Sequence, residues 1–131
     1  MNDGTDHFEE RYFYPMYGST RVVVADFDSD EDLDIAASAF FPDLESAYPE
    51  SFVYLQNQNV QEVDSFSFTP FSFPSQNDGR WMLMEKADLD QDDDQDILLG
   101  SSTVLRLQAG QQFGIQWKEN NLDFLILRNI H

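Results

Sequence analysis

The stretch that decides the fold is nine residues long and occurs twice. Its first copy reads Asp26-Phe27-Asp28-Ser29-Asp30-Glu31-Asp32-Leu33-Asp34. Its second copy begins 62 residues later and reads Asp88-Leu89-Asp90-Gln91-Asp92-Asp93-Asp94-Gln95-Asp96. Each copy has an aspartate at every odd position, and no other pattern in the chain is as specific.

Acidic residues at alternate positions indicate a calcium site. Calcium is a hard cation that binds six to eight oxygen atoms, and short acidic loops supply these atoms from alternate positions. Positions 1, 3, 5 and 9 would supply carboxylates, and position 7 a backbone carbonyl. The predicted ligands of the first site are Asp26, Asp28, Asp30, the carbonyl of Asp32, and Asp34. The predicted ligands of the second site are Asp88, Asp90, Asp92, the carbonyl of Asp94, and Asp96.

Two other interpretations of the loops are less consistent with the sequence. A solvated acidic turn has no reason to repeat the same spacing and to end both times in an apolar run. An EF-hand needs a bidentate Glu at position 12, where this chain has Ala37 and Leu99. It also needs flanking helices, whereas the β-branched run at 22–24 before the first loop favours a strand.

Position 6 of each loop is expected to adopt a positive φ, which usually selects glycine. Glu31 and Asp93 occupy this position. Because Asp tolerates the left-handed region better than Glu, we expect more backbone strain in the first loop. Position 6 therefore bears on the affinity of the loops for calcium and not on the identity of the metal.

Together with their flanking strands, the loops resemble the calcium loops of FG-GAP-like (VCBS-type) repeats. The match is carried by Val22-Val23-Val24-Ala25-Asp26-Phe27-Asp28, Asp34-Ile35-Ala36-Ala37-Ser38, Ala87-Asp88-Leu89-Asp90 and Asp96-Ile97-Leu98-Leu99-Gly100-Ser101. The resemblance covers about residues 8 to 131. It implies an all-β fold built from antiparallel four-stranded blades of an integrin-α-like β-propeller. It also implies two Ca²⁺ ions and an extracellular or cell-surface location.

The sequence predicts eight strands, enough for two four-stranded blades. The first of them is expected to be the outer strand of a blade, so the blade boundaries do not coincide with the start of the chain. The expected strands cover residues 8–14, 21–26, 34–40, 51–57, 64–73, 81–88, 96–105 and 123–129. Residues 1–20 would supply an outer strand that completes a blade, residues 21–73 the first blade, and residues 74–131 the second. The run 52–57 recurs at 124–129, so the second blade carries an insertion at about 102–123, and residues 43–49 are expected to form a loop.

The composition excludes several classes of partner. Net charge is −18, but twelve of the 25 acidic residues lie in the two loops, so the remaining chain is only moderately acidic. The chain has no basic cluster for nucleic acid and no apolar run long enough for a membrane span. Its start lacks the features of a signal peptide, and the absence of cysteine excludes disulfides.

The sequence favours binding over catalysis. The two histidines, His7 and His131, lie near opposite ends of the chain without a neighbouring nucleophile pattern. Carboxylates that already bind calcium are poor general bases. We therefore expect a non-enzymatic, calcium-stabilised module for adhesion or for binding a protein or carbohydrate. We further expect it to associate with further blades of a longer chain or with itself. The alternative, implied by the resemblance, is the propeller portion of a secreted polysaccharide-acting enzyme.

Overall fold

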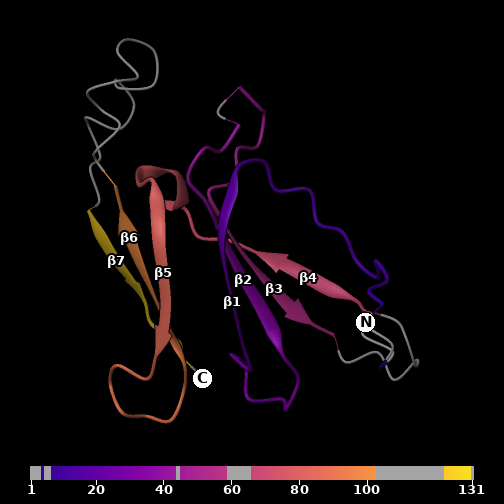
Figure 1. The fold of residues 1–131 in the computed structure, drawn as a ribbon. Helices are drawn as coiled ribbons and strands as arrows, with labels where there is room; N and C mark the ends of the chain where they lie inside the picture. Colours follow the sequence, from indigo (N-terminus) through magenta and orange to yellow (C-terminus); the bar gives the residue numbers. More distant parts are fainter. Residues whose placement is uncertain (1–3, 5–6, 44, 59–65, 103–122, 131) are drawn as a thin grey trace.

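A computed structural model describes residues 4, 7–43, 45–58, 66–102 and 123–130 of the chain. Within these residues the chain forms seven β-strands and one short 3-10 helix (Figure 1). The strands belong to two antiparallel sheets, so the fold is all-β as the sequence predicts.

The first sheet is a meander in which each strand pairs with the next one along the chain. Its strands are β1 (Ser19–Ala25), β2 (Asp34–Ala39), β3 (Phe52–Asn57) and β4 (Phe68–Phe71). Val22 and Val24 lie opposite Ala37 and Ile35, and such β-branched residues pack well on a pleated surface.

The second sheet repeats this arrangement with three strands among the described residues. After the 3-10 helix η1 (Gln76–Asp78) come β5 (Trp81–Ala87), β6 (Asp96–Ser101) and β7 (Phe124–Leu127). Ala87 pairs with Asp96 as Ala25 pairs with Asp34, and β1 and β5 both show a register irregularity near their start. The repeat in the sequence is therefore a repeat in strand register.

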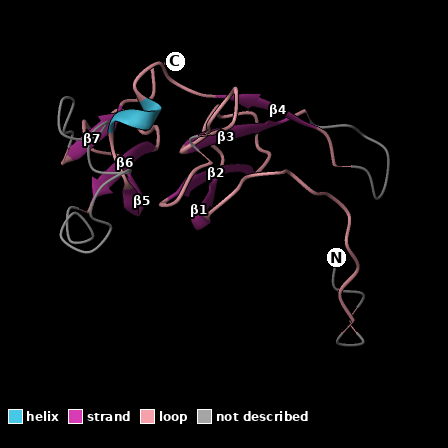
Figure 2. Ribbon diagram, turned by 90° about the horizontal axis from the view of Figure 1, so that it is seen from above, coloured by secondary structure: helices cyan, strands magenta, loops and turns pink. Residues whose placement is uncertain are grey.

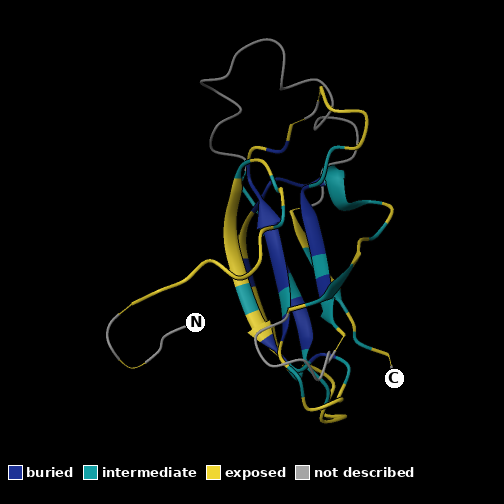
Figure 3. Ribbon diagram, turned by 90° about the vertical axis from the view of Figure 1, so that its right-hand side faces the viewer, coloured by how far each residue is buried: buried dark blue, intermediate teal, exposed yellow. Residues whose placement is uncertain are grey.

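The two sheets lie side by side (Figure 2) and bury a common core. The first sheet contributes Ala36 and Phe52 to this core, while the second contributes Met84, Ile97 and Leu99. Leu98, not Leu99, is the sequence counterpart of Ala36. The sheets therefore contact each other through opposite faces. Buried residues concentrate along the central strands (Figure 3).

The remaining two faces differ in how they are covered. On the first sheet Ala37, Val53 and Leu55 form a second buried cluster, against which Tyr14 and Met16 pack. The outer face of the second sheet, which points away from the first sheet, is largely open: its apolar side chains Leu83, Phe124 and Ile126 are 61%, 57% and 48% exposed. Among the described residues, only the first sheet has a buried apolar cluster on its outer face, although Val22 and Val24 of β1 are 55% and 43% exposed there.

The prediction of an outer strand at residues 8–14 is wrong. Phe8 forms an isolated bridge, and residues 9–16 have no regular secondary structure. Tyr14 instead packs on the first sheet, and its hydroxyl donates a hydrogen bond to Glu50 Oε1 at 2.8 Å. The segment contacts the face of the sheet and adds no strand to its edge.

The other seven expected strands are present, most of them shorter at one or both ends than predicted. Residues 64–65 and 103–105 of the expected strands lie outside the described residues, as does the insertion apart from its two ends. The described part of 43–49 forms turns and bends, as expected for a loop. Among the described residues no helix has the length and apolar character needed to cross a bilayer.

Candidate metal centre

The two acidic stretches form the same hairpin loop in the two sheets. Residues 26–34, the first loop, join β1 to β2, and residues 88–96, the second loop, join β5 to β6. Positive φ angles of 59–74° occur at positions 4 and 6 of each loop. These residues are Ser29, Glu31, Gln91 and Asp93. The expected positive φ at position 6 is confirmed. Position 4 was not foreseen because neither Ser nor Gln signals it.

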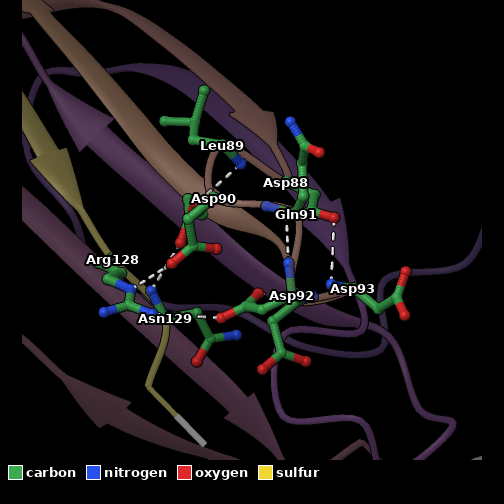
Figure 4. Close-up of polar contacts among 10 residues, drawn as sticks. Asp88, Leu89, Asp90, Gln91, Asp92, Asp93, Arg128 and Asn129 are labelled. Carbon is green, nitrogen blue, oxygen red and sulfur yellow. Dashed lines mark hydrogen bonds and ion pairs between the residues drawn. The ribbon is translucent and has the colours of Figure 1, made fainter.

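The aspartate at position 1 folds each loop around its own carboxylate. Asp26 Oδ1 accepts the N–H of Asp30 at 3.1 Å, and its Oδ2 accepts the N–H of Glu31 at 3.0 Å. Asp88 accepts the equivalent N–H groups, those of Asp92 and Asp93, at 3.2 and 3.1 Å (Figure 4). Two loops that differ at every even position thus share these two hydrogen bonds, and Asp88 accepts a third from the N–H of Gln91 at 2.7 Å.

The aspartate at position 9 fixes each loop to the third strand of its sheet. Asp34 Oδ2 accepts the N–H of Phe27 at 3.0 Å, and its Oδ1 accepts the N–H of Asn57 at 2.7 Å. Asp96 accepts the N–H groups of Leu89 and Asn129 at 3.0 and 2.9 Å. Asp34 is 0% and Asp96 2% exposed, so each carboxylate is a buried hub joining three segments.

Carboxylate oxygens converge in both loops. Asp26, Asp28 and Asp34 bring one oxygen each within 4.8 Å of one another, as do Asp88, Asp90 and Asp92. Either group could hold a metal ion. Asp30, Asp32, Asp94 and Asp96, also predicted as ligands, are not members of these groups.

Two buried carboxylate oxygens are a second indication, independent of the convergence of the aspartates, that a cation fits the first loop. Asp28 Oδ1 and Asp32 Oδ2 are inaccessible to solvent and have no hydrogen-bond partner. A buried polar atom without a partner costs about 1–3 kcal/mol, and a bound cation would remove this cost. Only the carbonyl of Asp32 was predicted as a ligand, but the structure also buries one oxygen of its side chain.

The third strand also delivers a side chain to position 3 of each loop, and here the two loops differ. Gln56 Nε2 donates a hydrogen bond to Asp28 Oδ2. Arg128, its counterpart, forms ion pairs with Asp90 at 2.5 Å and with Asp92 at 3.5 Å (Figure 4). The first loop receives a neutral amide and the second a cation.

The pKa directions of two loop carboxylates reflect this difference. The hydrogen bond from the Asp32 N–H lowers the pKa of Asp30, but desolvation and the neighbouring loop carboxylates outweigh it and raise the pKa overall. The pKa of Asp92 lies below its ordinary value, first because of the hydrogen bond from the Asp94 N–H and then with help from Arg128. The neighbouring carboxylates thus dominate around Asp30, while Arg128 contributes to the lower pKa of Asp92.

A tyrosine adds a further contact to the first hub. The hydroxyl of Tyr54 donates a hydrogen bond to Asp34 Oδ2 at 2.9 Å. Burial, this hydrogen bond and the nearby carboxylates all raise the pKa of Tyr54. In the first sheet Tyr54 lies opposite Ala36. At the equivalent position of the second sheet, Ile126 lies opposite Leu98. Asp96 therefore receives no equivalent hydroxyl.

The two loops contact each other. Ser29 Oγ lies 3.3 Å from Asp94 Oδ1, and Asn129 Nδ2 donates a hydrogen bond to the carbonyl oxygen of Phe27. Beside them, a cavity of about 380 Å³ opens between the sheets. Its lining is mainly apolar and aromatic: Phe27, Phe52, Tyr54, Phe71, Phe73, Ile97 and Leu127, with Asp28, Gln56, Arg128 and Asn129 among its polar residues.

Sequence reasoning missed the residues outside the loops that support them. Gln56, Asn57, Arg128 and Asn129 carried one signal, the recurrence of a run ending in Asn at 52–57 and 124–129. That recurrence indicated a repeated strand but not its contact with the loop. Of the two histidines, His7 is exposed and His131 lies outside the described residues.

Comparisons with protein-family models, with curated proteins and with solved structures gave no match. The functional argument therefore rests on the geometry of the two loops.

Proposed function

We propose that this chain is a calcium-binding module in which each loop holds one Ca²⁺ ion in a structural role. The observation that carries the proposal is the pair of loops with one backbone conformation and converging carboxylates, at the same place in two sheets. The unpartnered, buried oxygens of Asp28 and Asp32 support it independently.

The donor set favours calcium over other common metals. All available donors are oxygens, whereas zinc prefers nitrogen and sulfur ligands. Magnesium requires near-ideal octahedral geometry and keeps several of its waters, while calcium accepts six to eight oxygens in flexible geometry. A loop that offers several carboxylates and a backbone carbonyl suits calcium best.

We further propose that the two sheets are propeller blades of the FG-GAP/VCBS type. The meander order, the repeated loops and the contact between opposite faces support this assignment. Contact through opposite faces also lets a third sheet pack on Leu83, Phe124 and Ile126 in the same manner. The chain would then associate with further blades or with a second copy, and would act in an extracellular setting by binding a protein or carbohydrate.

The proposal is a binding role and not catalysis. Of the residues that line the cavity, Asp28, Tyr54 and Arg128 are ionisable, and each already contacts a residue of the loops or their hubs. Within the described residues, nothing favours a polysaccharide-acting site over a binding surface.

Calorimetric titration of Ca²⁺ into chelator-treated protein tests the metal sites. Extracellular modules bind calcium with Kd of roughly 10⁻⁴–10⁻³ M, and a tenfold excess over Kd adds about 1.4 kcal/mol of stability per site. Asp28→Ala should remove binding at the first loop and retain it at the second, while Glu10→Gln, which removes an exposed charge elsewhere, should change neither. Absence of heat and of any Tm shift at millimolar calcium would refute the proposal.

Sedimentation of the chain in calcium tests the assembly. We expect self-association that Ile126→Lys, a change on the open face of the second sheet, reduces. A compact wild-type monomer with cooperative melting at tens of micromolar would show that two sheets suffice.

A further inference from the structure

Gln56 and Arg128 occupy the same place in the two repeats. Each precedes the asparagine whose N–H binds the buried hub, Asn57 or Asn129. From there the two side chains reach the same loop position: Gln56 contacts Asp28 and Arg128 contacts Asp90. The difference between them is one positive charge at an equivalent point.

The two loops also differ in which carboxylate oxygens lack a partner, and Arg128 accounts for the difference at position 3. Asp28 Oδ1 and Asp32 Oδ2 of the first loop are buried without a hydrogen-bond partner. In the second loop the carboxylate of Asp90 pairs with Arg128, and that of Asp94 accepts a hydrogen bond from Ser29. Among the described residues, no carboxylate oxygen of the second loop is both buried and unpartnered.

We propose that Arg128 is a built-in counter-cation that sets the affinity of the second loop for calcium below that of the first. This inference rests on the proposed calcium function. A guanidinium stays charged at all ordinary pH values and only donates, so it neutralises carboxylates without supplying a ligand. Calcium must displace Arg128 from Asp90 and Asp92 before these oxygens coordinate it. Among the described residues, no cationic side chain pairs with the carboxylates of the first loop, so this loop should fill first.

The expected size of the effect is moderate. The Arg128 side chain is 61% exposed, and an ion pair that is open to solvent is weak in itself. Its charge also repels a dication bound to the same carboxylates, at short range and with partial solvent screening. Together these effects predict an affinity difference of about three- to tenfold between the loops.

Exchanging the two residues tests the inference. In calorimetric titrations with Ca²⁺, Arg128→Gln gives the second loop the residue of the first and should strengthen the weaker site about three- to tenfold. Gln56→Arg should weaken the stronger site by a similar factor. Arg21→Gln is the matched control, because it removes one positive charge that pairs with Glu85, outside both loops; it should leave both sites unchanged.

The outcomes distinguish a wrong role for Arg128 from a wrong calcium function. Two sites of equal affinity that Arg128→Gln leaves unchanged would overturn the role of Arg128 and retain the calcium sites. A second site weakened by Arg128→Gln would also overturn it, since Arg128 would then support binding. Absence of calcium binding in the wild type and all variants would overturn the proposed function and this inference together.

Discussion

The first sheet and the second sheet are built from one repeat, yet they differ in what surrounds them. On its outer face the first has a buried apolar cluster, and a tyrosine contacts its buried hub, whereas the second leaves Leu83, Phe124 and Ile126 exposed among the described residues. The loop backbones are nevertheless the same. The aspartates that the two loops share therefore set the loop conformation, and neighbouring residues set its charge and stability.

The largest expected effect separates the two faces of the second sheet. Leu99 is 0% exposed between the sheets, whereas Leu83 is 61% exposed on the open face. Leu99→Ala should lower the free energy of unfolding by about 2–5 kcal/mol because it leaves a cavity. Leu83→Ala should lower it by less than about 0.5 kcal/mol. Urea denaturation of both variants checks this contrast, and equal losses would mean that the open face is covered.

The next effect concerns the buried hubs. Asp34→Asn and Asp96→Asn each replace one accepting oxygen by an NH₂ group that faces an N–H donor. Measured in chelator, each should cost about 1.5–3 kcal/mol, the range for hydrogen bonds to charged groups. Asp34→Asn should cost more, because Asp34 also accepts the Tyr54 hydroxyl. If either variant lost calcium binding without losing stability in chelator, that aspartate would be a ligand only and no hub.

The sequence predicted the hubs' positions but not this role, and the reason is physical. Spacing alone identifies an oxygen-rich loop, and the recurrence of an apolar run that ends in Asn identifies the strands at 52–57 and 124–129. Whether Asp34 faces a metal or the N–H of Asn57 depends on strand register, which local sequence does not specify. Residues 8–14 were predicted as a strand, yet a strand needs a paired edge, and Tyr14 packs on a sheet face instead. The Arg128 contact likewise exists only once β7 is placed beside β6.

A smaller effect distinguishes Tyr54 from Ile126. Tyr54→Phe should cost about 1.5 kcal/mol, the low end of the range for hydrogen bonds to charged groups, by removing the hydroxyl that donates to the buried Asp34 carboxylate. The raised pKa of Tyr54 adds a pH signature. A group with a raised folded-state pKa stabilises the fold fully below its unfolded pKa, near 10 for tyrosine, and loses this contribution as pH rises above it. The stability difference between wild type and Tyr54→Phe should therefore be constant at pH 7–9 and shrink above pH 10. A difference that grows above pH 10 would contradict it.

The smallest effect compares position 6 of the two loops. Glu31 and Asp93 have φ of 73° and 74°, a region that glycine adopts without a steric penalty. Glu31→Gly should raise stability by up to about 1 kcal/mol and tighten calcium binding, because it relieves backbone strain. Asp93→Gly should gain less, since Asp tolerates this region better. Thermal melts with and without calcium measure both, and a loss on Glu31→Gly would show that its side chain supports the loop.

The hydrogen bonds from Asn57 and Asn129 to the hubs also have a consequence for the order of folding. Asn57 follows Asp34 by 23 residues, and Asn129 follows Asp96 by 33. At a synthesis rate of about 5–20 residues per second, a ribosome needs roughly 1–5 s to add the first interval and 2–7 s to add the second. During these seconds each loop is a flexible, strongly repelling acidic segment without its closing contact. Each loop is therefore completed only when the third strand of its own sheet arrives, and the second waits longer than the first.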